Sequence, residues 1–159
     1  MRKVLALLLA FVVGTGVVVA VTATQAGASS EFTVVGHITN VAFVTAKGTS
    51  LAPPGPLVPG DRLVTRADIV RNGAVVGYSE VVSTVTFNDD LFSEGINAFT
   101  NRGDLHVSGL LRGAVGPSGL PKVLDLIVDG GTFAFHNAHG SAHIVVLPNS
   151  DEVVTYAIG

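Results

Sequence analysis

Acidic residues inside strand-forming segments are the groups in this chain whose type and spacing could do chemistry. Asp68 alternates with Arg66 along one β-branched segment, and Glu80 alternates with Tyr78 along the next. Residues two apart share one face of a strand, and an Asn72-Gly73 turn would pair the two segments, so the two faces could meet. A carboxylate beside an arginine inside the fold would stay ionised and could orient a polar ligand.

Two interpretations of these four residues stay open. If they point inward, Asp68 and Glu80 are candidate catalytic residues, and Arg66 and Tyr78 are candidate ligand-binding residues. If they point outward, they form an exposed ion pair worth less than about 1 kcal/mol. The opposite face of the first segment is apolar and is the better candidate for core; it consists of Leu63, Thr65, Ala67 and Ile69.

Three histidines near the C-terminus, His136, His139 and His143, raise the question of a metal site. Their spacings would bring them together on a helix, but the surrounding residues predict turns and strands, and no acid lies among them. We therefore expect no metal. His139 is a candidate catalytic residue, because a near-neutral imidazole can donate or accept a proton. A solvated histidine in a turn is the alternative.

The first 28 residues predict a secretory signal peptide. Arg2 and Lys3 precede the uninterrupted apolar run Val4–Val21, and the small residues Ala26–Ala28 supply a cleavage site. The run has the length of a membrane span, so a retained anchor is the alternative. We expect cleavage near Ala28, a secreted, extracellular domain over residues 29–159, and no stable membrane insertion afterwards.

Composition limits the functions that this domain can have. Without Arg2 and Lys3, seven Lys and Arg remain against twelve acids, a net charge of −5. A domain without clustered cations is a poor nucleic-acid binder, so no nucleic-acid partner is expected. There is no cysteine, so stability must come from core burial or oligomerisation. Arg outnumbers Lys, and Ala, Val and Gly abound, which is typical of a GC-rich bacterial genome.

Alternating apolar residues rich in Val, Ile and Thr, broken at short intervals by Gly, Pro and Asn, predict an all-β domain. Such strands joined by short turns favour an eight-stranded antiparallel up-and-down barrel, since closure removes the sheet edges. A two-sheet sandwich is the alternative. The expected strands are residues 32–45, 61–71, 75–87, 95–100, 104–115, 122–128, 141–147 and 152–158, with a proline-rich loop at 47–60.

Two glycine-containing motifs carry a family resemblance. The first is Gly103–Gly109, with Leu105 between the glycines. The second begins at Gly130-Gly131-Thr132 and continues through Phe135, Ala138 and Gly140. Their order and spacing resemble the dirigent and allene oxide cyclase-like barrels over about residues 60–159. We interpret Gly130 and Gly131 as structural, allowing positive φ or close strand approach.

The resemblance implies a barrel that binds a small hydrophobic molecule and steers its cyclisation or isomerisation by shape, without a cofactor. The chain departs from the family pattern at several positions. Its first expected strand has no acid after Glu31, where both kinds of barrel have a carboxylate. Phe133 replaces a usual glycine, Ala134 replaces an aspartate, and His139 replaces an arginine. No complete catalytic set is present, so neither activity is carried over, and it stays open whether the barrel is an enzyme. A non-catalytic carrier and a filled structural envelope barrel are the alternatives. The family also implies a homo-oligomer, a homotrimer above all.

Overall fold

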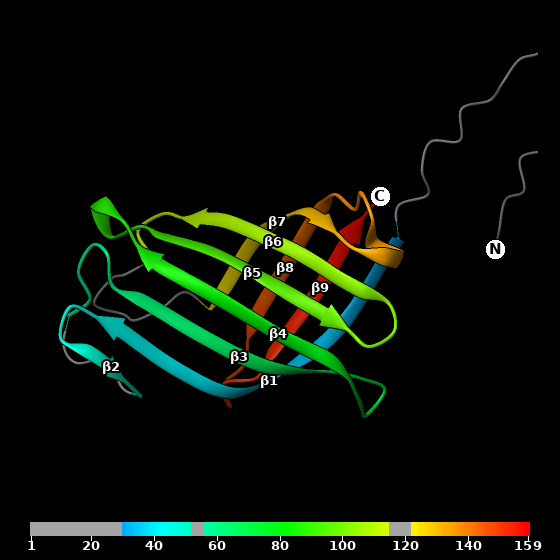
Figure 1. Ribbon diagram of the computed structural model, residues 1–159, viewed down its shortest axis with the longest axis horizontal. Helices are drawn as coiled ribbons and strands as arrows, with labels where there is room; N and C mark the ends of the chain where they lie inside the picture. The colour runs from blue at the N-terminus through cyan, green and yellow to red at the C-terminus, as the bar shows by residue number, and fades with distance from the viewer. Residues whose placement is uncertain (1–29, 52–55, 115–121) are drawn as a thin grey trace, which may run out of the picture.

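A computed structural model describes residues 30–51, 56–114 and 122–159. The expected signal peptide, residues 1–28, lies outside the described residues, as do positions 52–55 of the expected proline-rich loop and residues 115–121. The described residues form an all-β fold in which a single antiparallel sheet curls into a closed barrel (Figure 1). None of them forms a helix that could cross a membrane.

Within the described residues, eight strands make the barrel wall. Each pairs antiparallel with the next wall strand, and the last pairs with the first. Every wall strand therefore has two partners, which confirms the predicted up-and-down barrel. The wall strands are β1 (Ser30–Thr45), β3 (Arg62–Arg71), β4 (Ala74–Val85), β5 (Leu91–Phe99), β6 (Gly103–Leu111), β7 (Val123–Gly131), β8 (Gly140–Val146) and β9 (Glu152–Ile158).

Several boundaries differ from the prediction. The segment 47–60, expected to be a loop, contains the short strand β2 (Gly48–Ser50), which pairs with the end of β1. β5 begins at Leu91 rather than near Gly95, because Leu91 and Ser93 continue its inward alternation. Gly130 and Gly131, expected in a turn, end β7. Two short 3-10 turns, η1 (Phe87–Asp89) and η2 (Phe133–Phe135), connect strands.

The glycines at the end of β7 have different roles. A Cβ on Gly131 would lie 2.5 Å from the Asp104 carbonyl oxygen and 2.6 Å from that of Phe135. Only glycine allows this close approach, as expected from its place in the motif. A Cβ on Gly130 would meet nothing within 4 Å. The close strand approach expected for the pair therefore applies to Gly131 alone.

Alternation along the strands sorts the residues into an apolar interior and a mixed outer face. Leu63, Ala67 and Ile69 of β3 are buried, as the apolar face of this segment predicted. The larger buried cluster takes side chains from most of the wall strands, including Val34, Leu105, Leu126 and Tyr156. This cluster therefore stabilises the barrel by burying apolar side chains from strands all around the wall.

One end of the barrel is closed by four aromatic rings. Phe32 stacks on Tyr156 with ring centroids 4.9 Å apart, and Phe99 lies 5.3 Å from Phe135. The two pairs touch, since Phe32 and Phe99 meet edge to face at 5.8 Å. Such contacts add to the burial energy of large rings. The Arg102 guanidinium covers the Phe135 ring at 5.0 Å, so a cation faces solvent over this aromatic cluster.

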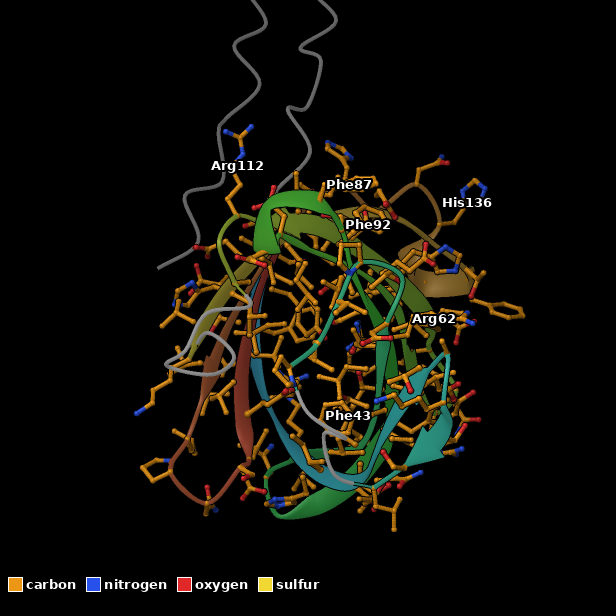
Figure 2. All side chains as sticks on the ribbon, turned by 90° about the vertical axis from the view of Figure 1, so that its left-hand side faces the viewer. Phe43, Arg62, Phe87, Phe92, Arg112 and His136 are labelled. Carbon is orange, nitrogen blue, oxygen red and sulfur yellow. The ribbon has the colours of Figure 1, made fainter. Side chains whose placement is uncertain are left out.

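The opposite end contains a second, smaller core of Val85, Leu91 and Ala114. Figure 2 looks along the barrel from this end, with Phe43 inside the wall and Arg112 pointing away from it. On this side β8 and β9 are short: β9 pairs with β1 only as far as Gly36. The first residue of β9, Glu152, therefore stands partway along the barrel, where this part of the wall ends.

Candidate functional site

An acid points into the barrel. Glu152 occupies the same inward parity along β9 as Val154, Tyr156 and Ile158, all of which are buried. Glu152 itself is partly buried, and burial raises the pKa of its carboxyl group because the charged form is poorly solvated there. Among the described residues it has no ion-pair partner. The folded protein therefore holds this proton more tightly than the unfolded chain does.

Small side chains make room for this carboxyl group. Gly36 of β1 is the register partner of Glu152 across the strand pair. A Cβ added to Gly36 would lie 3.5 Å from Glu152 Oε2 and 3.7 Å from the Cβ of Ala67. The carboxyl group therefore lies against a stretch of wall made of small residues, rather than against a partner of opposite charge.

A second polar group lies on the same inner wall. Asn97 of β5 is 6% exposed, and it pairs in register with Ser79 of β4, which in turn pairs with Ala67 of β3. Gly36, Ala67 and Ser79 thus form a strip of small residues that runs between Glu152 and Asn97. Among the described residues the Asn97 amide has no hydrogen-bond partner. No sealed side-chain nitrogen or oxygen of the described residues lacks a partner, so this amide faces accessible space and not packed core.

Tyr156 is the third polar residue of this interior and is 1% exposed. Burial and the nearby charge of Glu152 raise the pKa of its phenol well above the usual value, so the hydroxyl stays protonated. Its ring is fixed by the stack on Phe32. The hydroxyl has no hydrogen-bond partner among the described residues. In that part of the chain, every side-chain oxygen or nitrogen that is fully sealed from solvent has a partner, so this hydroxyl is not sealed. It therefore opens onto internal space.

That internal space is small. A cavity of about 20 Å³ lies in the middle of the barrel, bordered by Glu152, Asn97, Ser79 and Tyr156 together with aliphatic side chains. This is room for about one water molecule. None of the described residues bordering it is Lys, Arg or His. The site thus combines one acid, one amide and two hydroxyl groups in a setting without a cation, where a negatively charged ligand would find no counter-charge.

The residues singled out in the sequence lie elsewhere. β3 and β4 pair through the Asn72-Gly73 turn as predicted, with Arg66 opposite Glu80 and Asp68 opposite Tyr78. All four face outward, in the parity opposite to the buried residues of β3 and β4. The Arg66 guanidinium lies 4.9 Å from the centre of the Tyr78 ring. The structure thus joins these residues into one outer cluster.

His139 lies apart from both clusters. It is exposed near the C-terminus, its Nδ1 is 3.2 Å from the Asn137 carbonyl oxygen, and its backbone pairs with that of Gly159. Figure 2 shows His136 pointing away from the barrel. His143 faces outward on β8, with Nδ1 2.6 Å from Asp125. In the described part of the chain, no group of three or more His, Cys, Asp or Glu residues is placed to hold a metal.

Sequence reasoning missed Glu152, Tyr156, Asn97 and Ser79, although a signal for them exists. Glu152 shares the parity of three apolar residues in its own strand, and Asn97 shares the parity of Leu91 and Phe99. A polar residue on the apolar parity of a strand predicts a polar group inside the fold. Asp68 and Glu80, the acids selected from the sequence, lie instead on the charged, outward parity of β3 and β4.

Comparison with known proteins confirms the fold. Neither a family model nor a curated protein matches the sequence. Among solved structures, the chain is similar to pyocyanin demethylase, with a TM-score of 0.66 and 17% identity over 82% of this chain and 100% of that one. It is also similar to the pterocarpan synthase dirigent protein GePTS1, with a TM-score of 0.54 and 17% identity over 82% of each chain.

A third similar structure is a nonspecific heme-binding cyclase that catalyses a (4 + 2) cycloaddition in neoabyssomicin biosynthesis. Its TM-score is 0.55, with 14% identity over 81% of this chain and 63% of that one. The three known proteins share one kind of barrel. This chain has the barrel fold of the dirigent and cyclase-like proteins, as the glycine motifs predicted. At these identities the likeness extends to the fold alone.

Proposed function

We propose that the barrel binds a small hydrophobic, uncharged molecule in its interior and steers the cyclisation or isomerisation of that molecule, with Glu152 as the group that moves a proton. One observation carries the proposal: an acid with a raised pKa, an amide and a phenol share an apolar interior without partners among the described residues. Polar groups kept in a core at an energetic cost are typical of functional sites.

In this proposal, the Glu152 carboxyl group acts first as a base and then as an acid. An ionised Glu152 accepts a proton from one atom of the ligand, and the neutral acid returns it to another, so an isomerisation needs no external reactant. Asn97 and the Tyr156 hydroxyl hold the polar end of the ligand, while the aliphatic wall fixes its shape. The similar folds of known cyclase, dirigent and demethylase proteins support a ligand-handling role of this kind.

The water-sized cavity sets a condition on this proposal. A ligand of even ten non-hydrogen atoms does not fit into about 20 Å³. Binding therefore requires movement either of the aromatic rings at one end or of the side of the barrel where β8 and β9 are short. The same volume favours a second candidate function, a filled barrel with a structural role in the envelope. The two are separated by whether the interior opens to a guest.

Two related dyes test the choice. N-phenyl-1-naphthylamine is uncharged, and 8-anilino-1-naphthalenesulfonate has the same rings with an anionic group. We expect fluorescence enhancement with the first and little with the second, and loss of the signal in Ala142→Leu, which fills the cavity. Ala157→Leu, on the outer face of the same region, is the control. Ser79→Val serves if Ala142→Leu fails to fold.

The outcome decides between the two functions. If neither dye binds and Ala142→Leu leaves the protein folded, the barrel is filled and structural. If the uncharged dye binds, native mass spectrometry of protein purified from its source identifies the retained molecule, and turnover of that molecule by wild type but not by Glu152→Gln establishes an enzyme. Equal turnover by both proteins would leave a shape-only catalyst and remove Glu152 from the mechanism, and no turnover by either protein would leave a carrier.

We also propose that the domain is exported. The positive residues at 2–3, the apolar run and the small residues before Ser29 support cleavage near Ala28. The intact mass of protein recovered from culture medium tests this. A protein that starts near Ser29 agrees with secretion, whereas full-length protein in the membrane fraction indicates a retained anchor.

A further inference from the structure

The outer wall of the barrel carries a second site, separate from the interior. A groove of about 500 Å³ runs over the outer faces of β4, β5, β6 and β7. This volume lies within the range of small-molecule sites. Apolar side chains form part of its surface, namely Tyr78, Val82 and Ile96, and carboxylates form another part, namely Glu80, Glu94 and Asp129. Tyr78 and Ile96 are exposed by 42% and 43% and so present apolar surface to a ligand in the groove.

The backbone shapes this groove. The register between β6 and β7 shifts between His106 and Val107, so Asp129 is an extra residue that bulges from β7. The Ser108 hydroxyl donates a hydrogen bond to the Asp129 carboxylate over 2.6 Å and fixes it at one side. At the other side, Tyr78 is held by the Arg66 guanidinium over its ring. A side chain on each side of the groove is therefore held in place by a contact with a neighbouring residue.

Acidic and apolar residues alternate in a checkerboard on the floor of the groove. Glu80 is opposite Ile96 across the β4–β5 pair, and Val82 is opposite Glu94. The two glutamates are therefore diagonal neighbours on one face, a separation that long side chains can bridge. The two apolar residues occupy the other diagonal. A ligand on this floor meets an apolar surface and two carboxylates at once.

The charge of the groove is unbalanced. Among the described residues, none of Glu80, Glu94 and Asp129 belongs to an ion pair; the two pairs found there join His37 to Asp151 and His143 to Asp125. Arg66, opposite Glu80 across the β3–β4 pair, lies at the margin with its guanidinium over Tyr78. Among the described residues, His106 is the one basic side chain on the groove surface itself. Three carboxylates around apolar contacts attract positive charge and repel anions.

We propose that this groove binds an organic cation with an apolar body, such as an ammonium group on an aromatic or branched aliphatic skeleton. The ammonium group lies between Glu80 and Glu94, and the apolar body covers Ile96 and Val82 beside Tyr78. The proposal is independent of the interior site, because it concerns residues on the opposite face of the same strands.

A pair of probes with one skeleton tests it. 2-Phenylethylammonium and 3-phenylpropanoate share the phenyl ring and have opposite charges. Two-dimensional NMR of the full domain should show amide shifts around Glu80, Glu94 and Ile96 that saturate with the ammonium probe and not with the carboxylate probe. Glu94→Gln and Glu80→Gln should each weaken binding by about three- to fivefold, and raised salt should weaken it further.

The controls separate the site from general charge. Glu31→Gln removes an exposed acid on β1, away from the groove, and should leave the affinity unchanged. Circular dichroism checks that each variant is folded. Equal shifts with both probes, shifts spread over the whole surface, or the same affinity in Glu80→Gln, Glu94→Gln and Glu31→Gln would each overturn the proposal. So would an oligomer that Ile96→Glu breaks apart, since a second copy would then fill the groove.

Discussion

The carboxyl group of Glu152 lies against Gly36, its partner across the seam that closes the barrel. A Cβ on Gly36 would stand 3.5 Å from Glu152 Oε2 and 3.6 Å from Glu152 Cβ. These are ordinary contact distances, so a methyl group on Gly36 would fit beside the carboxyl group. Gly36 of β1, which has no side chain, thus leaves room for the carboxyl group of Glu152, the acid of the candidate interior site.

The effect of a substitution at Gly36 on stability should therefore depend on the size of the new side chain. Gly36→Ala should be tolerated, because its methyl group meets the neighbours at normal distances. Gly36→Val overfills the space and should destabilise the fold by about 1–3 kcal/mol while it moves the carboxyl group. Urea unfolding measures the first effect. Carbon NMR titration of Glu152 measures the second, and a titration curve unchanged in Gly36→Val would contradict the placement of the carboxyl group against Gly36.

Glu152 should reduce stability at neutral pH. Its pKa is raised in the folded state by burial, so the native protein holds this proton more tightly than the unfolded chain does. Stability therefore falls as the pH rises from the unfolded pKa of 4.5 through the folded pKa, and stays lowered above it. Each unit of raised pKa corresponds to about 1.4 kcal/mol.

Glu152→Gln removes this penalty, so its stability relative to wild type should be higher at pH 8 than at pH 4. Urea unfolding at the two pH values measures the difference. Glu80→Gln, on the outer face, is the matched control and should change stability little at either pH. A Glu152→Gln protein that loses more stability at pH 8 than at pH 4 would show that the ionised carboxyl group has a stabilising partner.

The fold could be predicted from the sequence to a large extent, because local patterns decide it. The Asn72-Gly73 turn sets the register of β3 and β4, and strand alternation identifies the inward face of β3. The interior site could not be located in this way. Only closure of β9 on β1 places Glu152 against Gly36. Among the described residues, the cavity is bordered by residues from seven strands together, so no single segment reveals its size.

Phe133 adopts a backbone conformation that suits glycine, with φ 49°, at the position where the resembling barrels usually have glycine. A non-glycine residue there is strained by about 1–2 kcal/mol, and the Phe133 ring is 88% exposed, so it gains little from burial. Phe133→Gly should therefore stabilise the fold by about 1 kcal/mol after the greater chain entropy of glycine is taken into account. Phe133→Ala keeps the strain and should not stabilise. Chemical unfolding of the three proteins measures this, and equal gains in both variants would place the effect in the exposed ring instead of the backbone.

The outer apolar residues beyond the groove support the expected homo-oligomer. Phe92 and Leu110 are opposite each other across β5 and β6, and with Ile127 they are 38%, 50% and 56% exposed. Burial of such a strip in an interface would stabilise a domain without disulfides.

We expect light scattering after size exclusion to give a mass above that of the monomer, and a trimer if the resemblance extends to assembly. Leu110→Glu should shift the mass toward the monomer, because it places a charge within the strip. Val75→Glu, at an exposed position near the β3–β4 turn, should leave it unchanged. A wild-type mass equal to that of the monomer would rule out this assembly, and an oligomer that withstands Leu110→Glu would place its interface on another face.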